Sequence, residues 1–224
     1  ARFERTWVVL NGVATEGAVV AVGLYGTRVN IGYGSGGGWD GFGLERVVTR
    51  SEGNVLYEVD GRPALDLYEA YLGELARGLP ATARHFPLSL RKNSESNERV
   101  VRTVLSVNLE ERSLTFAGDL PQGHLAQLMR SNLDRLVDGA EQAVQNLISR
   151  VHPSGPGLLV AISCVGRRLV MRDRVEEEVE ATLERIPAGT LQVGFYSYGE
   201  LSPSRTGRCD LHNQTMTLTG IWES

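Results

Sequence analysis

The last part of the chain places polar side chains directly before a strand of ordinary structural type. Residues 209–220 read CDLHNQTMTLTG. Strict alternation puts His212 and Gln214 on the same face as Met216 and Trp222, so both polar side chains are expected to point inward. A buried His or Gln needs hydrogen-bond partners, and an inward His otherwise stays uncharged. These groups therefore either join neighbouring strands or line a cavity.

A second stretch could contribute to the same site. Residues 195–203 read FYSYGELSP, and Tyr196, Tyr198 and Glu200 share one face of a regular strand. In a structural interpretation, the His and Gln of the last strand hydrogen-bond to backbone and to Glu200. In a functional interpretation, they line a polar cavity with the two tyrosines and Arg167. Spacing alone leaves both interpretations open.

The cysteines suggest metal or thiol chemistry only weakly. Cys209 and His212 form a C-x-x-H pair, but a structural zinc site needs four ligands and the remaining histidines are scattered. Cys164 lies in an apolar strand, where thiols are usually inert. We expect two free thiols, no metal site and no enzyme activity. A thiol enzyme would need one of the cysteines to be exposed and ionised.

A glycine-rich segment matches the G-x-G-x-x-G pattern at Gly32, Gly34 and Gly37. A dinucleotide site requires a helix directly after these glycines, because the helix N-terminus meets the pyrophosphate. More glycine and then a β-rich run follow instead. The segment is therefore interpreted as a flexible loop, in the manner of a lid, rather than as a phosphate site.

Composition excludes several classes of protein. The chain has 224 residues, a formal net charge of −4 and a hydrophobic content of 42%. It has no run of Lys and Arg typical of nucleic-acid binding and no apolar run long enough to span a membrane. Its first residues do not follow the pattern of a signal peptide, so none is expected. Two cysteines without a secretory signal indicate a reducing compartment, so a cytoplasmic location is expected.

The pattern of elements predicts a mixed α/β fold with largely antiparallel sheets and helices packed outside, rather than a doubly wound Rossmann fold. A helix should begin with Pro63 as its first residue and end at Gly78, and a long helix should run from His124 to Val151. Asp173 and Glu176 form a capping box for another helix, whose buried face should consist of Val175, Val179, Leu183 and Ile186. The last two strands are expected to be neighbours. Strands are predicted at residues 6–12, 16–26, 27–34, 45–50, 54–59, 100–107, 113–117, 158–165, 191–201 and 212–222.

These motifs resemble those of the FIST domain, a sensory module named for F-box and intracellular signal transduction proteins. The likeness rests on SCVGRR at residues 163–168, on the capped helix after it, and on GFYSYGELSP followed by CDLHNQTMTLT. Residues 51–73, SEGNVLYEVDGRPALDLYEAYLG, are similar to the junction between the two halves of the family. Ser197 and Leu201 are mild departures from the Tyr-Thr-Tyr-Gly-Glu-Ile typical of the family.

The resemblance implies a non-enzymatic bacterial sensor that binds a small molecule such as an amino acid. Its expected partners are a histidine kinase, a cyclic-di-GMP enzyme or a chemotaxis receptor. One alternative is a haem protein that senses nitric oxide, with His212 or a cysteine as axial ligand. Another is an interaction module without ligand. The residues carried over as ligand-binding candidates are Cys164, Arg167, Tyr196, Tyr198, Glu200, His212, Asn213 and Gln214.

The resemblance also predicts how the chain is divided. Residues 1–61 would be the end of the N-terminal half and residues 62–224 the whole C-terminal half. On this interpretation the chain starts within a fold, and strands between Thr6 and Val59 lack partners. Unpaired strand edges favour pairing with another chain, so a homodimer or aggregation is expected.

Overall fold

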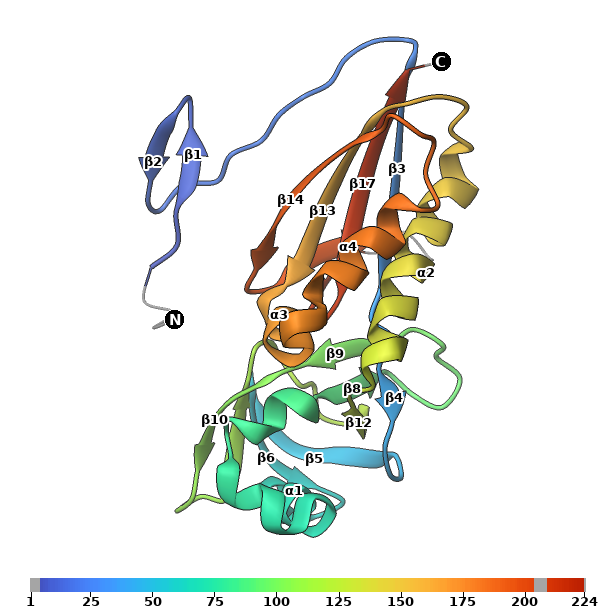
Figure 1. Ribbon diagram of the computed structural model, residues 1–224. Helices are drawn as coiled ribbons and strands as arrows, with labels where there is room; N and C mark the ends of the chain where they lie inside the picture. Colours follow the sequence, from blue (N-terminus) through green and yellow to red (C-terminus); the bar gives the residue numbers. More distant parts are fainter. Residues whose placement is uncertain (1–4, 204–208, 224) are drawn as a thin grey trace.

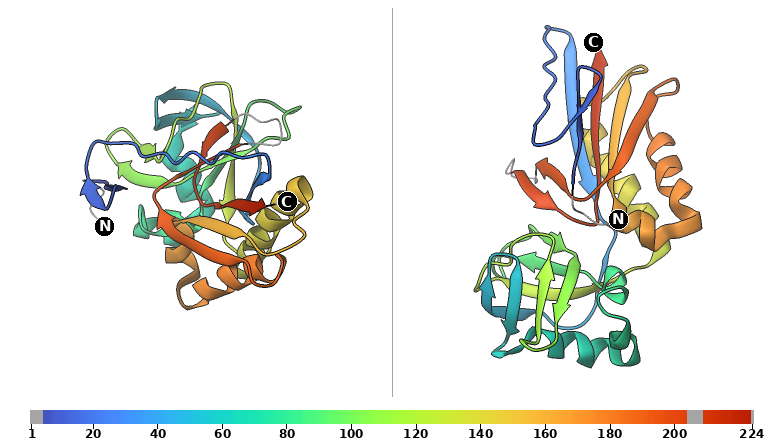
Figure 2. Two further views of the ribbon diagram at one scale, coloured as in Figure 1. Left: turned by 90° about the horizontal axis from the view of Figure 1, so that it is seen from above. Right: turned by 90° about the vertical axis from the view of Figure 1, so that its left-hand side faces the viewer.

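The fold consists of two modules stacked on each other (Figures 1 and 2). It is described by a computed structural model for residues 5–203 and 209–223. The upper module is a four-stranded sheet with helices on one face, and the lower module is built around a nine-stranded sheet. The first strand of the upper sheet comes before the lower module in the chain and the others after it. The lower module is thus an insertion into the upper one.

The upper sheet has the strand order β14-β13-β17-β3. β13 and β14 are parallel and the other pairs are antiparallel. The last two long strands, β14 and β17, were expected to be neighbours. This prediction was wrong, because β13 lies between them. The elements are β3 (Val29–Gly36), β13 (Leu158–Cys164), β14 (Leu191–Ser197), β17 (Met216–Glu223), α2 (Leu133–Val151), α3 (Val165–Met171), η3 (Arg172–Arg174) and α4 (Val175–Leu183).

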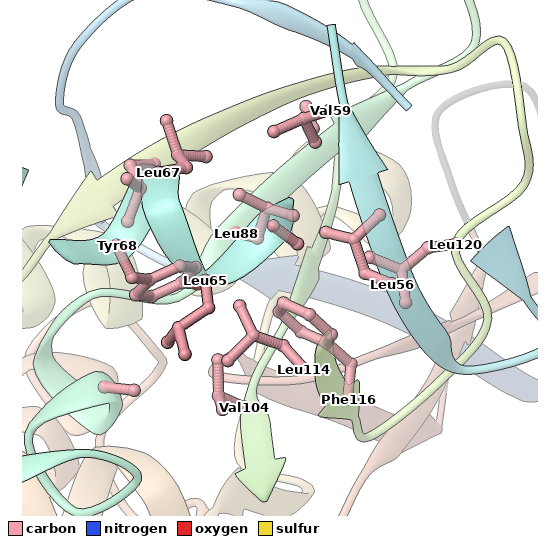
Figure 3. Packing of buried hydrophobic residues seen from close by; sticks show 14 of the residues in the cluster. Leu56, Val59, Leu65, Leu67, Tyr68, Leu88, Val104, Leu114, Phe116 and Leu120 are labelled. Carbon is pink, nitrogen blue, oxygen red and sulfur yellow. The ribbon is translucent and has the colours of Figure 1, made fainter. Parts of the chain in front are cut away.

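The lower sheet is antiparallel throughout and follows the order β10-β11-β6-β5-β12-β8-β9, with β4 on β12 and β7 on β6. Tyr68 and Leu65 of its helix pack on Leu114 and Phe116 of the sheet (Figure 3). The elements are β4 (Asp40–Gly41), β5 (Arg46–Glu52), β6 (Val55–Val59), β7 (Arg62–Pro63), α1 (Ala64–Leu72), η1 (Gly73–Gly78), η2 (Thr82–His85), β8 (Leu88–Arg91), β9 (Val100–Arg102), β10 (Val104–Asn108), β11 (Ser113–Phe116) and β12 (Leu125–Arg130).

These sheets confirm the expected fold class, a mixed α/β fold with mostly antiparallel strands and helices outside. The division of the chain near residue 61 stays a prediction. Strands β5 and β6, which precede that position, are hydrogen-bonded to β12 and β11, which follow it. Within the described ranges, no helix has both the length and the apolar character needed to cross a membrane.

Several predicted elements differ from those in the structure. Residues 16–26 form no strand, and the side chains of Val19 and Tyr25 are 96% and 93% exposed, because no neighbouring strand pairs with the segment. The hairpin before it, β1 (Val8–Leu10) with β2 (Val13–Thr15), stands apart from both modules (Figure 1). The first predicted helix ends at Leu72 and continues as the 3₁₀ turn η1.

The long helix begins later than its apolar pattern suggested. Residues 125–130 are strand β12 because they pair with β8 and β5 on either side. The helix starts only after Asn132, whose side chain accepts hydrogen bonds from the backbone of Asp134 and Arg135. An Asn cap of this kind satisfies N–H groups that have no partner within the helix.

The glycine-rich segment is a packing surface and not a lid. Gly34 and Gly36 belong to β3, and a Cβ on either would overlap the backbone carbonyl of Ala143 or Gly139 in α2. Alternate glycines on one face of the strand therefore let the helix backbone lie directly on the sheet. This contact keeps α2 on the sheet, where Val144 of the helix and Leu218 of β17 belong to one apolar cluster.

The last helix buries polar groups where apolar ones were predicted. Glu178 and Thr182 are fully buried in α4, whereas Val179 and Leu183 are 37% and 41% exposed. The expected capping box does not form: the helix follows the turn η3 at Arg174 without a side-chain cap. The spacing of apolar residues could not reveal which face of α4 is buried, because that face contains Glu178, which forms an ion pair with Arg167.

Candidate functional site

A cavity of about 310 Å³ lies where the two modules meet. Its lower wall comes from the η1–η2 connection, η2, the β9–β10 bend, the start of β10 and the residue after β11. Its upper wall comes from the β13–α3 junction, the turn after β14 and the bend before β17 (Figure 1). We call it the junction cavity; its lining residues are Pro80, Ala81, Arg84, Thr103, Val104, Leu105, Ala117, Cys164, Val165, Gly166, Leu169, Tyr198 and Asn213.

The upper wall is set by an abrupt change from strand to helix. β13 ends at Cys164 and α3 begins at the next residue. The Cys164 N–H donates a hydrogen bond of 3.0 Å to the carbonyl of Thr215, which fixes this corner to the bend before β17. At Gly166 a Cβ would lie 2.6 Å from the Gln214 amide, so only glycine fits without displacing Gln214.

Two hydrogen bonds join the modules beside the cavity. The Thr103 N–H donates to Oδ1 of Asn213 at 3.3 Å. The Arg102 guanidinium donates to the carbonyl of Leu211 at 2.8 Å, which is the second bond between the modules. Within the lower module it also donates to the carbonyl of Asp119 at 3.0 Å. Burial lowers the pKa of Arg102, and these carbonyl contacts stabilise its charge. The β9–β10 bend is thereby attached to the end of β16 (Cys209–His212), which pairs with β15 (Glu200–Pro203).

The cavity wall is mostly apolar with few polar groups. Arg84 is its one charged residue among those the structure describes, and its Nε donates to the carbonyl of Ala81 at 2.7 Å. The Thr103 hydroxyl oxygen is buried and has no hydrogen-bond partner in the described part of the chain. Unpaired buried hydroxyls are uncommon, and they gain free energy when a ligand or water supplies the missing bond.

Arg167 and Tyr196 are committed to an internal network and do not line the cavity. Arg167 is fully buried and donates to Glu178 at 2.8 Å, to the carbonyl of Gly37 at 2.5 Å and to that of Leu136 at 2.7 Å. Glu178 also accepts hydrogen bonds from Ser163 and Tyr196. Burial and the Glu178 charge raise the pKa of Tyr196, so it remains a neutral donor. The network fixes α2, α3 and α4 to the sheet.

Glu200 is a buried carboxyl with internal partners. It accepts hydrogen bonds from Ser197 at 2.6 Å and from the Thr215 hydroxyl at 3.1 Å. Burial raises its pKa to about 7, and the hydrogen bonds oppose that shift. It pairs in register with His212 across the β15–β16 hairpin, yet neither residue lines the junction cavity.

His212 and Gln214 were expected to lie in one continuous strand with Met216 and Trp222. Instead, His212 ends β16, and Gln214 lies in the bend between β16 and β17. Gln214 has a positive φ of 62°, which ends the hairpin strand and lets β17 begin at Met216. Its amide is fully buried, and neither of its polar atoms has a partner in the described residues; the same holds for Nε2 of His212. Burial lowers the pKa of His212. From Met216 to Trp222 the predicted alternation is confirmed.

The thiols are poorly suited to catalysis or metal binding. Cys164 lines the cavity, but burial raises its pKa to about 11, so it is protonated at neutral pH. Cys209 is exposed on β16. Within the residues that the structure describes, no cluster of three His, Cys, Asp or Glu side chains could hold a metal ion.

Of the eight predicted site residues, the junction cavity brings together Cys164, Tyr198 and Asn213. Arg84 and Thr103 were missed because they lie in a turn and a bend without a recognisable motif. A ligand-binding role for any of these residues stays a prediction. Larger depressions of about 910 Å³ and 630 Å³ lie beside the C-terminal part of α2 and beside η1, and none of the predicted residues lines them.

Comparison with known families matches residues 1–62 to the FIST N domain and residues 64–203 to the FIST C domain. An uncharacterised protein of Methanocaldococcus jannaschii is 22% identical over 243 aligned positions, which cover 98% of this chain and 46% of that protein. The chain thus spans about half the length of the curated relative it matches. No solved structure matches the chain.

Proposed function

This chain belongs to the FIST family of sensory signal-transduction domains, and from that premise we propose that the junction cavity is its small-molecule sensing site. The cavity is the observation that carries the proposal. It combines an apolar wall with a few polar groups, as ligand sites usually do, and its volume is at the lower end of the range of about 300–1,000 Å³ for such sites.

The position of the cavity suits a sensor because a ligand there contacts both modules at once. A ligand shifts a conformational equilibrium only when it binds one state more tightly than the other. The modules are joined near the cavity by the Thr103–Asn213 and Arg102–Leu211 hydrogen bonds. A ligand that touches both walls therefore favours the docked arrangement over any arrangement in which these bonds are lost.

The proposed role is non-enzymatic. The thiol that lines the cavity is held in its protonated form, and the described cavity wall has no carboxylate or imidazole that could act as acid or base beside Arg84. The signal would pass to a histidine kinase, a cyclic-di-GMP enzyme or a chemotaxis receptor, in a bacterial cytoplasm. These partners and this location follow from the family resemblance.

Haem is the alternative with less structural support. Of its expected axial ligands, His212 and Cys209 do not line the junction cavity, and Cys164 lines it with a protonated thiol. The residues therefore do not fit a haem in this cavity. The visible spectrum of the purified protein tests the alternative directly, since bound haem gives a Soret band.

A thermal-shift screen of small molecules tests the proposed function. Ligands that raise the melting temperature of the native protein should have no effect on the variant Ala117→Leu, which fills the cavity. Ala70→Leu on the exposed side of α1 is the control and should respond like the native protein. Equal responses of all three proteins would place binding elsewhere, and no response to any compound would favour an interaction module without ligand.

A further inference from the structure

The charges on the cavity wall indicate which class of ligand the site accepts. Arg84 is cationic, and none of the described lining residues is acidic. Apart from Nε, which is bonded to Ala81, its guanidinium donors have no partner in the described part of the chain. A guanidinium presents its donors in a planar fork that matches a carboxylate.

An ammonium group would meet no counter-charge among the described lining residues of the cavity. The buried carboxyl of Glu200 accepts hydrogen bonds from Ser197 and Thr215 and lies outside the lining. Glu178, the other buried carboxyl named above, is paired with Arg167. Moving an ammonium out of water without a paired anion is costly. The site therefore disfavours zwitterionic amino acids.

The remaining wall defines the body of the ligand. Val104, Leu105, Val165 and Leu169 are apolar, and Ala117 leaves space between them. The unpaired Thr103 hydroxyl supplies one further hydrogen-bonding group beside them. A short branched or aromatic body fills such a wall better than a polar one, because burial of apolar surface is favourable.

We propose that the ligand of this domain is a small monocarboxylic acid with an apolar body and no ammonium group, its carboxylate bound by Arg84. The proposal rests on the proposed function, since it assumes that the junction cavity is the sensing site. It differs from the amino-acid ligand that the family resemblance suggested, and the absence of an acidic group on the described lining is the reason.

Matched compounds separate the contributions of the carboxylate and of the ammonium. 4-Methylpentanoate, its primary amide and leucine share one apolar body, as do 3-phenylpropanoate, its amide and phenylalanine. Binding is measured by calorimetry at neutral pH. In at least one series the acid should bind roughly tenfold or more tightly than its amide, which loses the charge-assisted hydrogen bond to Arg84. It should also bind roughly tenfold or more tightly than the amino acid, whose ammonium group leaves water without a counter-charge.

Variants of two arginines locate the carboxylate. Arg84→Gln should weaken binding of the acid roughly tenfold or more and leave binding of the amide unchanged. Arg77→Gln removes a similar charge from the neighbouring turn, where Arg77 is paired with Glu74 and does not line the cavity, and it should have no effect. Melting temperatures of both variants verify that they are folded.

The outcomes separate this inference from the proposed function. If the amide or the amino acid binds as tightly as the acid, and Ala117→Leu abolishes that binding, the carboxylate inference is wrong while the sensing site stands. Equal effects of Arg84→Gln and Arg77→Gln would also overturn the inference. If no compound of either series binds at millimolar concentration, this inference fails, and the broader screen decides whether the sensing site fails with it.

Discussion

The backbone N–H of Thr103 donates a hydrogen bond of 3.3 Å to the Asn213 side chain, and this bond connects the two modules at the edge of the junction cavity. Thr103 separates β9 from β10, and Asn213 follows β16. Asn213 also donates to the carbonyl of His212 at 3.2 Å, which holds its side chain in place. Residues separated by 110 positions thus join the lower and upper walls of the cavity.

The replacement Asn213→Ala should weaken the connection between the modules. The Thr103 N–H then loses its partner in a partly buried position, at a cost of about 1–3 kcal/mol in the free energy of unfolding. Urea unfolding measures the loss. Asn213→Asp keeps an acceptor for the same N–H and should recover part of it, whereas an Asp variant no better than Ala would show that this hydrogen bond is unimportant.

The Arg167–Glu178 ion pair should matter for stability because both side chains are fully buried. Arg167→Met leaves Glu178 without its cation and should reduce the free energy of unfolding by about 3–5 kcal/mol. The control Arg185→Met breaks the partly exposed pair with Glu141, and its effect should stay within about 1 kcal/mol. Similar effects of the two variants in urea unfolding would contradict this account of the buried network.

Glu200 should make stability depend on pH. Its pKa is raised from 4.5 to about 7 in the folded protein, so the folded state holds a proton that the unfolded state has already released. Stability should therefore fall as the pH rises from about 4.5 to about 7 and level off above that, with a total change of about 3 kcal/mol.

Glu200→Gln removes this titration while other groups, such as His212, still titrate. The difference in unfolding free energy between the native protein and the variant should thus shift in favour of the variant as the pH rises through that window. Chemical unfolding at a series of pH values measures the difference. A difference that stays constant across the window would show that Glu200 is ionised normally in the folded state.

Gly34→Ala tests the close packing of α2 on β3. Its new methyl group would overlap the carbonyl of Ala143, so the helix must move, at a cost of about 1–3 kcal/mol or more. Gly155→Ala is the matched control, because no atom lies within 4 Å of the added methyl group there. Thermal unfolding compares the two, and equal stability of both variants would refute direct backbone contact between strand and helix.

The sequence was most informative where one local pattern decides the structure. Alternation from Met216 to Trp222 correctly predicted a strand with one buried face. The same reasoning failed at residues 125–130, where apolar spacing suited a helix but pairing with two neighbouring strands made β12. It failed at residues 16–26 for the opposite reason. This β-rich segment has no neighbouring strand to pair with, so it forms no strand.

The candidate site was predictable only in part, because it is assembled from both modules. Cys164, Tyr198 and Asn213 stand in or beside recognisable motifs, whereas Arg84 and Thr103 reach the cavity through the docking of the modules. Arg167 was expected to line the ligand cavity. Its partner Glu178 could not be recognised, since a buried Glu in a helix looks like any surface Glu in sequence.

Hydrogen–deuterium exchange with a stabilising ligand from the screen tests the sensing site most directly. Ligand in the junction cavity should slow exchange in two distant segments at once, residues 103–105 of the lower module and residues 164–169 of the upper one. Ala117→Leu should show no such protection. Protection confined to residues 142–153 and 184–187, which border the groove beside α2, would contradict the account and place the ligand there instead.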